Sequence, residues 1–363
     1  MLCRLNWPAF KRNFLMMTRL KCRKFEGMSL VVFTELGFYC PQADVYIDPL
    51  RKVPRAIVTH AHSDHARPGM GSYLCECSGV EIMKLRLGKG ISIQGLVYGE
   101  SIFMNGVEIT LFPAGHVPGS AQVRLSYHGE IWVISGDYKT LADGLSPAFE
   151  SVRCHHFVTE STFGLPIFHW KPQAEVFADI NDWWQQNAEC GTTSIILGYS
   201  VGKAQRIIKY LDRGVGDVVC YSTISETNRV LEAVGFDFGE WVDGAKGLDA
   251  ADYRNGGLSQ AMLVCPSAAI KSPWMMGLER FAVANCSGWM AMQKSQHWGA
   301  VDKGFVMSDH ADWSQLLEAV VSSNAENVYV THGFSEIFAR YLRENLFIHA
   351  EVVKVGHWNR TEE

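Results

Sequence analysis

The sequence predicts a mixed α/β protein in which a second α/β module interrupts a strand-rich first unit. Short apolar and β-branched runs separated by Gly, Pro and Asn fill residues 28–165, and a related pattern returns at 300–363. Between them, residues 166–299 alternate strands with helices, which is typical of a separate module. A chain of 363 residues with 47% hydrophobic content can bury one large core plus a module of about 100 to 150 residues.

The first unit is predicted to begin with an antiparallel sheet and to end in a hairpin. Its early strands are predicted at residues 31–33, 45–47, 56–59, 91–93 and 107–112. Residues 121–127 then alternate apolar and polar side chains, His128 and Gly129 form a two-residue turn, and residues 130–135 return as the second strand. The hairpin therefore delivers Asp137 to a strand end.

The module and the last unit are predicted from helical and apolar runs. Residues 172–189 are expected to form a helix with Pro172 in its first turn, followed by a strand at 194–197 and a helix at 203–211. Short strands are predicted at 218–221, 262–264, 281–284, 305–307, 328–331 and 350–355, and further helices at 313–321 and 336–345.

The net charge of −5 is unevenly distributed along the chain. Residues 1–27 carry seven Lys or Arg against one Glu, a charge of +6 that leaves −11 for the rest. This basic head is interpreted as a disordered extension before a true start at Met28, the alternatives being a targeting segment or a nucleic-acid arm. The acidic body disfavours a broad footprint on DNA or RNA, so any such contact is expected in a cleft where metal ions supply positive charge.

Composition also excludes a membrane protein and a disulfide scaffold. No apolar run approaches the roughly 18 residues needed to cross a bilayer. The ten Cys lack paired spacing and follow no secretory signal, so they are expected to stay reduced in the cytoplasm. Cys75 and Cys77 are interpreted as buried thiols on a strand or short helix.

The densest chemical signal is the segment Thr-His-Ala-His-Ser-Asp-His-Ala at 59–66. It places His60, His62, Asp64 and His65 within six positions directly after an apolar run. Imidazole nitrogen and carboxylate oxygen suit zinc and similar divalent ions, and a cluster of this density can hold two ions. The alternative is a polar loop that happens to be rich in histidine.

Five further candidates lie in turns that follow or close apolar runs. They are His116, Asp137, Glu160, His310 and His332. Taken singly, a His or Asp in such a turn is more often a helix cap or a surface residue. Taken with the cluster at 60–65, they predict ligands from distant strands that converge on one point, because Gly-flanked turns let backbones approach closely.

The order of these motifs resembles that of the metallo-β-lactamase family, and the later motifs are similar to those of its β-CASP nucleases. E-S-T-F-G at 160–164 resembles the motif before an inserted domain, while S-D-H-A-D at 308–312 and V-T-H-G at 330–333 resemble the two that follow it. Asp48 within I-D-P, S-D-H-A-R-P-G, and G-Y-S-V-G-K-A-Q-R are similar to the bacterial ligase-associated DNA exonucleases, a group also labelled mRNA 3′-end processing factor-like. The resemblance implies an αββα sandwich with an inserted α/β β-CASP domain.

The resemblance also implies a binuclear site with two Zn²⁺, Mn²⁺ being the alternative. It assigns one ion to His60, His62 and His116, the second to Asp64, His65 and His332, and the bridging position to Asp137. Two cations about 3.5 to 4 Å apart activate water and stabilise the attacking and leaving oxygens of a phosphoryl displacement. Asp64 is therefore also counted as catalytic.

Three residues are expected to assist the ions. His310 is the candidate general acid, because the alkoxide leaving group of a phosphodiester needs a proton. Glu160 is expected to orient either His310 or the nucleophile. Asp48 is expected to support the metal-binding loop without touching metal.

Weaker signals concern substrate contacts. Ser200, Lys203 and Arg206 open a helix after a strand, which suits either a phosphate of the substrate backbone or a plain helix start. The Gly spacing there is one residue short of a Walker A loop, so ATP binding is not predicted. Lys139 is a further candidate for the path of the strand, and Trp289 is interpreted as core more readily than as a base-stacking platform.

The leading hypothesis is a zinc-dependent nuclease that hydrolyses phosphodiester bonds of DNA, acting as an exonuclease in DNA repair. An RNA-processing nuclease is the first alternative, because within the β-CASP group a His at the position of His332 goes with RNA enzymes. A thioester or lactam hydrolase and a non-catalytic binding module are the others. A DNA ligase or helicase partner is implied by family association alone.

Overall fold

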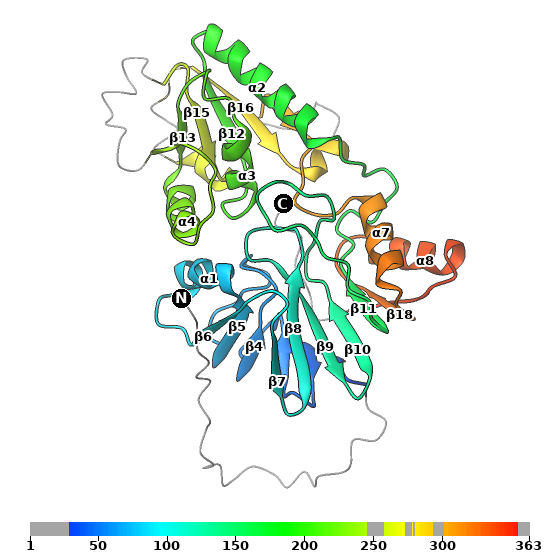
Figure 1. The fold of residues 1–363 in the computed structure, drawn as a ribbon. Helices are drawn as coiled ribbons and strands as arrows, with labels where there is room; N and C mark the ends of the chain where they lie inside the picture. The colour runs from blue at the N-terminus through cyan, green and yellow to red at the C-terminus, as the bar shows by residue number, and fades with distance from the viewer. Residues whose placement is uncertain (1–28, 245–257, 273–277, 279, 293–300, 355–363) are drawn as a thin grey trace.

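The computed structural model describes residues 29–244, 258–272, 278, 280–292 and 301–354, so the basic head at 1–27 lies outside the described residues. Within this part of the chain the strands form three sheets, with helices packed on their faces (Figure 1). No helix in the described ranges is both long enough and apolar enough to cross a bilayer.

The first sheet has six strands, and its direction changes at β3. Its strands are β1 (Val32–Thr34), β2 (Gly37–Cys40), β3 (Val45–Ile47), β4 (Arg55–Ile57), β5 (Ser72–Glu76) and β6 (Ile93–Leu96). The pairs β1–β2 and β2–β3 are antiparallel, but β3–β4, β4–β5 and β5–β6 are parallel. The prediction of an antiparallel sheet is therefore wrong for three of the five strand pairs, because the connections that follow β3 cross over instead of turning back.

The second sheet has seven strands in the order β19-β18-β11-β10-β9-β8-β7. They are β7 (Ser101–Met104), β8 (Val107–Pro113), β9 (Ala121–Tyr127), β10 (Glu130–Ile134), β11 (His156–Thr159), β18 (Asn327–Val330) and β19 (His349–Val352). The β9–β10 hairpin predicted from sequence is confirmed. Strands β18 and β19 complete this sheet from the end of the chain, pairing in parallel beside β11.

The first two sheets pack face to face and are covered on their outer sides by helices. Ile57 and Leu74 of the first sheet share a buried core with Val123 and Trp132 of the second. Helix α1 (Val80–Leu87), preceded by the 3₁₀ turn η1 (Cys77–Gly79), covers the outer face of the first sheet, and α7 (Trp313–Ser323) and α8 (Ser335–Asn345) cover that of the second. The layers thus run helix, sheet, sheet, helix.

The third sheet is wholly parallel and comes from the middle of the chain. Its strands are β14 (Val242–Asp243), β13 (Val218–Cys220), β15 (Met262–Cys265), β12 (Thr193–Leu197), β16 (Phe281–Cys286) and β17 (Lys303–Phe305), in that order. Helices α2 (Gln173–Glu189), α3 (Lys203–Tyr210) and α4 (Ser222–Ala233) contribute buried side chains to one face, with the turns η2 (Ser267–Lys271) and η3 (Gly288–Met292) between strands.

In this region one sequence prediction shifts and two are confirmed. The strand expected at 305–307 lies at 303–305 and pairs with β16, so the third sheet continues past the predicted boundary at residue 299. The helices expected at 172–189 and 203–211 are confirmed as α2 and α3. Trp184 of α2 is fully buried and its indole N–H donates to the carbonyl of Gln260, as a core residue would.

Candidate metal centre

The loop that carries the histidine cluster leaves β4 and is tied down by Asp48. The Asp48 carboxylate accepts hydrogen bonds from Thr59 N at 2.8 Å, Thr59 Oγ1 at 2.7 Å and His65 Nδ1 at 2.7 Å. An ionised carboxylate only accepts, so His65 carries its proton on Nδ1 in this contact and turns Nε2 the other way. The support role predicted for Asp48 agrees with these contacts.

Three other imidazoles are held in the same manner, each by one ring nitrogen. His62 Nε2 donates to the carbonyl of Val201 at 3.0 Å, and His116 Nδ1 to that of Asp309 at 2.8 Å. The Thr59 hydroxyl gives its one hydrogen to Asp48, so it accepts from His60 Nδ1 at 3.1 Å. Hydrogen bonding at one nitrogen fixes the tautomer and aims the lone pair of the other, the usual arrangement of metal-ligating His.

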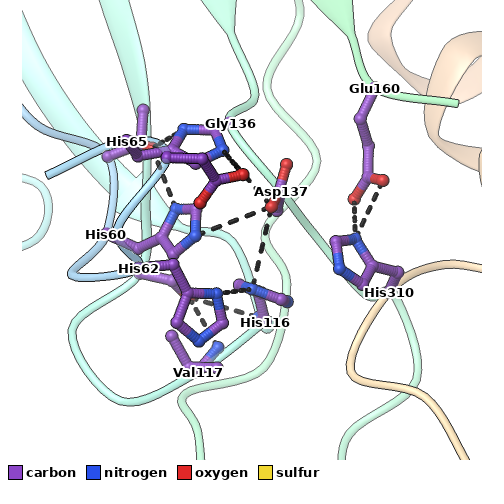
Figure 2. Close-up of polar contacts among 12 residues, drawn as sticks. His60, His62, His65, His116, Val117, Gly136, Asp137, Glu160 and His310 are labelled. Atoms are coloured by element: carbon purple, nitrogen blue, oxygen red, sulfur yellow. Dashed lines mark hydrogen bonds and ion pairs between the residues drawn. The ribbon is translucent and has the colours of Figure 1, made fainter. Parts of the chain in front are cut away.

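The second nitrogens face a common point, as Figure 2 shows. His62 Nδ1 and His116 Nε2 lie 3.1 Å apart, although both are acceptors once the opposite nitrogens have donated. His60 Nε2 is buried and has no hydrogen-bond partner among the described residues. Bare, buried nitrogens of this kind fit a divalent cation, and the donor set of neutral imidazoles with carboxylates suits zinc or manganese.

Asp137 brings a carboxylate to the same point from the end of β10. Its Oδ2 lies 3.4 Å from His65 Nε2, 3.6 Å from His60 Nε2 and 3.9 Å from His116 Nε2 (Figure 2). The preceding Gly136 has a φ of 56°, and a Cβ there would lie 2.6 Å from Thr59, so only glycine allows this approach. Asp137 Oδ2 therefore faces nitrogens of the segment at 60–65 and also that of His116.

The electrostatics of the cluster favour neutral rings at His60 and His62, ionised carboxylates, and positive charge at His65. Burial lowers the pKa of His60 well below its usual range, helped by the neighbouring rings, and lowers that of His62 to about 3. Burial opposes ionisation of Asp137, but His65 and His310 outweigh it and hold the pKa of that carboxyl well below its ordinary value. The pKa of His65 is raised well above normal, because Asp137, Asp64 and Asp48 outweigh its burial and favour positive charge at this point.

The structure brings six of the seven predicted ligands together. Possible ligand atoms within 4.8 Å of one another form three groups: His60, His62, His116 and Asp137; His60, Asp64 and His65; and Asp137, Glu160 and His310. His332 follows β18 with a φ of 56°, and its ring centroid lies 5.7 Å from that of His65, outside these groups. Its assignment to the second ion remains a prediction.

Glu160 and His310 form a pair at the edge of the cluster. His310 Nδ1 lies 3.0 Å from Glu160 Oε1 and 2.9 Å from Oε2, and Tyr138 N donates to the same carboxylate at 2.8 Å (Figure 2). The ring centroid of His310 lies 4.6 Å from that of His116. Glu160 thus contacts His310, one of the two partners considered for it.

Residues that sequence reasoning missed hold the loop around His310. The indole N–H of Trp170 donates to the carbonyl of His310 at 2.9 Å, and Trp170 N donates to Asp312 Oδ2 at 2.9 Å. Phe163 packs against Trp170 and Trp289 with centroid distances of 4.8 and 4.9 Å. Trp289 and Trp170 are half-buried and pack around the buried ring of Phe163. No local pattern in the sequence marked Trp170 for this position.

The predicted substrate contacts have mixed outcomes. Arg206 is 5% exposed; its Nε donates to Gln173 Oε1 and its Nη1 to the Ser308 carbonyl and Asp309 Oδ1, at 2.7, 2.8 and 3.2 Å. Lys203 is also buried, and Ser200 Oγ lies 3.2 Å from Thr223 Oγ1. Arg206 thus links α3 to the loop that carries His310. This structural role differs from both predicted roles, a phosphate contact and a plain helix start.

Fold and site together define a mixed α/β protein with a buried His and Asp cluster that fits a metal centre at the ends of strands from two sheets. No family model matches the chain. The chain is similar to a solved structure described as a protein of unknown function from Enterococcus faecalis V583, with a TM-score of 0.58, 12% identity, and coverage of 83% of this chain and 80% of that one. At that identity the likeness concerns the fold alone.

Three named proteins are related in sequence. The chain is 28% identical over 311 residues to a probable DNA ligase of Opitutus terrae, 24% over 272 residues to RNase aCSPSF2 of Saccharolobus solfataricus, and 25% over 124 residues to cleavage and polyadenylation specificity factor subunit 3 of Dictyostelium discoideum. The matches cover 85, 65 and 33% of this chain but 30, 54 and 16% of the relatives, so the chain spans less than two thirds of each. All three are β-CASP members of the metallo-β-lactamase family, which is the family that the sequence motifs of this chain resemble.

Proposed function

We propose that this protein is a metal-dependent nuclease that hydrolyses phosphodiester bonds of DNA as an exonuclease, with two Zn²⁺ in its centre. The observation that carries the proposal is the Glu160–His310 pair beside the His and Asp cluster, with His310 Nδ1 2.9 Å from Glu160 Oε2. A metal cluster alone suits many hydrolytic reactions. A histidine poised next to it suits a reaction whose leaving oxygen must be protonated.

The proposal assigns each unit of the chain a part in this architecture. Residues 28–165 and the final segment form the metallo-β-lactamase sandwich, and the third sheet with its helices forms the β-CASP insert. The pairing of β17 with β16 supports an insert that extends to Phe305, beyond the predicted boundary at residue 299. The insert reaches the centre through Val201, whose carbonyl binds His62.

The ligands are assigned to two ions that share one carboxylate. One ion would be held by His60, His62 and His116, the other by Asp64, His65 and His332, and Asp137 would be available to both. Such a pair, when bound, lowers the pKa of water and stabilises charge on the phosphoryl oxygens. Asp48 keeps His65 in the ligating tautomer, because it accepts the Nδ1 proton.

His310 is the proton donor of the proposed reaction. Its Nδ1–H is bound by Glu160, so Nε2 is the atom that exchanges a proton with the leaving oxygen. Glu160 orients the ring and stabilises its protonated form, as a carboxylate does for imidazole in other hydrolytic sites. The carbonyl contact from Trp170 fixes the backbone of His310 in the same position.

An RNA-processing nuclease is the second candidate. It is favoured by His332 at the last motif and by two of the related proteins, which are named as an RNase and a cleavage and polyadenylation factor. DNA is favoured by the relative named a DNA ligase, which matches 85% of this chain. That match covers 30% of the relative, so a ligase or helicase partner is a further proposal that rests on the name of a longer protein.

The test is digestion of matched DNA and RNA oligonucleotides, labelled at either end, by purified protein with Zn²⁺ or Mn²⁺. We expect stepwise shortening of DNA from one end, lost in His60→Ala. Cleavage of RNA without cleavage of DNA would select the second candidate. No cleavage of either polymer, with metal present in stoichiometric amount, would reject a nuclease altogether.

A further inference from the structure

The third sheet presents two half-buried aromatic side chains, Tyr199 and Trp289 (the aromatic pair), at the edge where its strands end. Strands β12 and β16 are parallel neighbours, so the segments that carry Tyr199 and Trp289 leave the sheet at the same edge. The first of these segments reaches the metal centre, because the carbonyl of Val201 binds His62. Open parallel sheets bind their ligands at this carboxyl edge.

Tyr199 packs directly against the metal centre. Its ring centroid lies 4.8 Å from that of His62, at an interplanar angle of 73°. The His62 ring lies 4.9 Å from that of His116, which in turn lies 4.6 Å from that of His310. The rings of the centre thus form a row, in which Tyr199 contacts the first ring and the proposed proton donor His310 is the last.

Trp289 lies next to the other end of this row. Phe163 joins it to His310, with ring centroids 4.9 Å from Trp289 and 6.1 Å from His310. Gly288 brings the backbone of the turn onto the Phe163 ring, since a Cβ at Gly288 would lie 2.4 Å from Phe163 Cζ. The half-buried Phe334 flanks Trp289 at 6.1 Å. Packing therefore fixes Trp289 close to His310, although part of the Trp289 side chain stays accessible.

The side chains of the protein body give little electrostatic hold on a nucleic acid. Residues 28–363 carry a net charge of −11, and two of the cations near the centre, Lys203 and Arg206, are buried. Stacking of a base on an aromatic side chain supplies affinity that needs no positive charge, and it tolerates any sequence because every base has a π-face. Half-buried rings at both ends of the centre suit that interaction.

We propose that the aromatic pair binds bases on the two sides of the phosphodiester that the centre cuts, an inference that rests on the proposed function. A strand with its phosphate at the centre directs one neighbouring nucleotide toward Tyr199 and the other past His310 toward Trp289. A base stacks on a side chain only when it is released from the duplex, where pairing and neighbouring bases enclose it. The aromatic pair therefore selects unpaired strands and reads no particular sequence.

The first test is a cycle that combines an altered protein with an altered strand. Single-stranded oligonucleotides of the polymer that the protein cuts carry one abasic residue, placed at successive positions around the cut bond. We expect kcat/KM to fall about 5- to 100-fold when the abasic residue flanks the cut bond, the range that stacking on one aromatic side chain gives. Trp289→Leu should lower kcat/KM on the complete strand by a similar factor, and little further on the strand that already lacks the base stacked on Trp289. Tyr199→Leu should behave in the same way with the base on the other side.

Conservative variants and a control separate stacking from folding. Trp289→Phe and Tyr199→Phe retain a ring and should keep most of the rate. Trp241→Leu is the control, because Trp241 is also half-buried but precedes β14, at the edge of the third sheet away from β12 and β16. It should change neither the rate nor the effect of the abasic residue. A ring that only supports the fold would instead lower the rate by one factor on complete and abasic strands alike.

The preference for unpaired strands gives a second comparison. A duplex with fully paired ends should be cut about 10-fold or more slowly than the same strand alone, because its bases must first be unstacked. Additive losses in the cycle for both residues, equal rates on complete and abasic strands, or a duplex cut as fast as the single strand would each overturn the inference. Any of these results in an active wild type leaves the proposed function standing.

A binding measurement distinguishes failure of the inference from failure of the proposed function. Fluorescence anisotropy of labelled oligonucleotides with full-length His310→Ala protein follows binding without cleavage. We expect the abasic strand to bind more weakly than the complete one, and Trp289→Leu in the same background to remove that difference. If the wild type cuts no polymer, the proposed function fails and this binding cycle alone decides whether the aromatic pair holds bases.

Discussion

At the scale of single residues, Asp48 orients the ring of His65 without being one of the predicted metal ligands. Three donors share its two oxygens, and one of them is the ring of His65. Asp48→Asn has one carbonyl oxygen for the same donors and a competing N–H₂. We expect metal affinity to fall about 10- to 100-fold, as for other residues that orient a ligating histidine, measured by competition with a chromogenic chelator.

Asp44→Asn is the matched control for Asp48→Asn. Asp44 lies at the surface, where its carboxylate binds Arg55 and accepts from the hydroxyl of Tyr39. Removing that charge is expected to leave metal affinity unchanged. Equal losses in both variants would mean that the effect is general electrostatics and not orientation of His65.

The pair Glu160–His310 makes a prediction that depends on the leaving group. If His310 protonates the leaving oxygen, His310→Ala should lower kcat on DNA by about 100- to 10,000-fold and Glu160→Gln by a smaller factor in the same direction. Hydrolysis of bis(p-nitrophenyl) phosphate should fall far less, because nitrophenolate leaves without a proton. Steady-state kinetics on both substrates check this.

His349→Ala serves as the control for His310→Ala, since His349 is exposed and pairs with Asn327 at the start of β18, the opposite end of that strand from His332. It should change neither rate. Equal losses on the two substrates in His310→Ala would assign that residue to substrate or metal binding instead of proton transfer.

Sequence could predict the parts of the site that lie in local motifs. His60 to His65 fall within six positions, so spacing alone predicts their convergence. Glu160 and His310 are 150 positions apart, and their pairing depends on how β11 and the loop before α7 meet. The carbonyl of Val201 has no side-chain signal at all, because backbone acceptors look alike in any sequence.

At the scale of elements, the hydrophobic periodicity of the sequence predicts where the long helices lie. It does not predict the order in which the strands pair. The 17-residue helix α2 lies within one residue of its predicted start, because a long amphipathic pattern with Pro172 before it is unambiguous. Strand β11 was not predicted, since four residues carry no resolvable period. The parallel pairing of β3 with β4 depends on the path of the connection, which residue types do not record.

The start of α3 gives a prediction at this scale. Gly202 has a φ of 94°, and a Cβ there would lie 2.2 Å from Val117 Cγ1, beside His116. Gly202→Ala should therefore push α3 away from the centre and move the Val201 carbonyl that holds His62. We expect kcat/KM to fall about 100-fold, the effect of a shift near 1 Å in a catalytic site, measured on the preferred oligonucleotide.

Gly191→Ala separates backbone strain from displacement. Gly191 also has a positive φ, 63°, but a Cβ there meets nothing within 4 Å. Gly191→Ala should cost about 1 to 2 kcal/mol of stability through its positive φ, seen as a lower melting temperature. Gly202→Ala should cost more, because its φ of 94° and ψ of −76° lie outside the left-handed helical region and its Cβ also meets Val117. Only Gly202→Ala should lose activity; parallel losses would show that α3 does not position the centre.

At the scale of the whole molecule, the metal centre is built from residues that belong to all three sheets or to the segments that follow their strands. His60 comes from the end of a strand in the first sheet, His116 and Asp137 from the second, and Val201 from the third-sheet unit. The arrangement arises because strand ends of all three units open toward one point, with Arg206 binding the loop at 308–309. No single segment of sequence encodes such a meeting of units.

This arrangement predicts that the metal stabilises the fold as a whole. A ligand that binds only the native state adds about 4 kcal/mol at a thousandfold excess over its Kd, which corresponds to several degrees in the melting temperature. Chelation with EDTA should lower the melting temperature of the wild type by that order, and added Zn²⁺ or Mn²⁺ should restore it. His60→Ala should lose less melting temperature to the chelator than the wild type does, because it lacks a ligand assigned to one of the two ions. His349→Ala should respond to chelator like the wild type. A wild-type melting temperature that ignores EDTA, in protein verified to release its metal, would mean that the units dock without help from the ions and that the cluster serves chemistry alone.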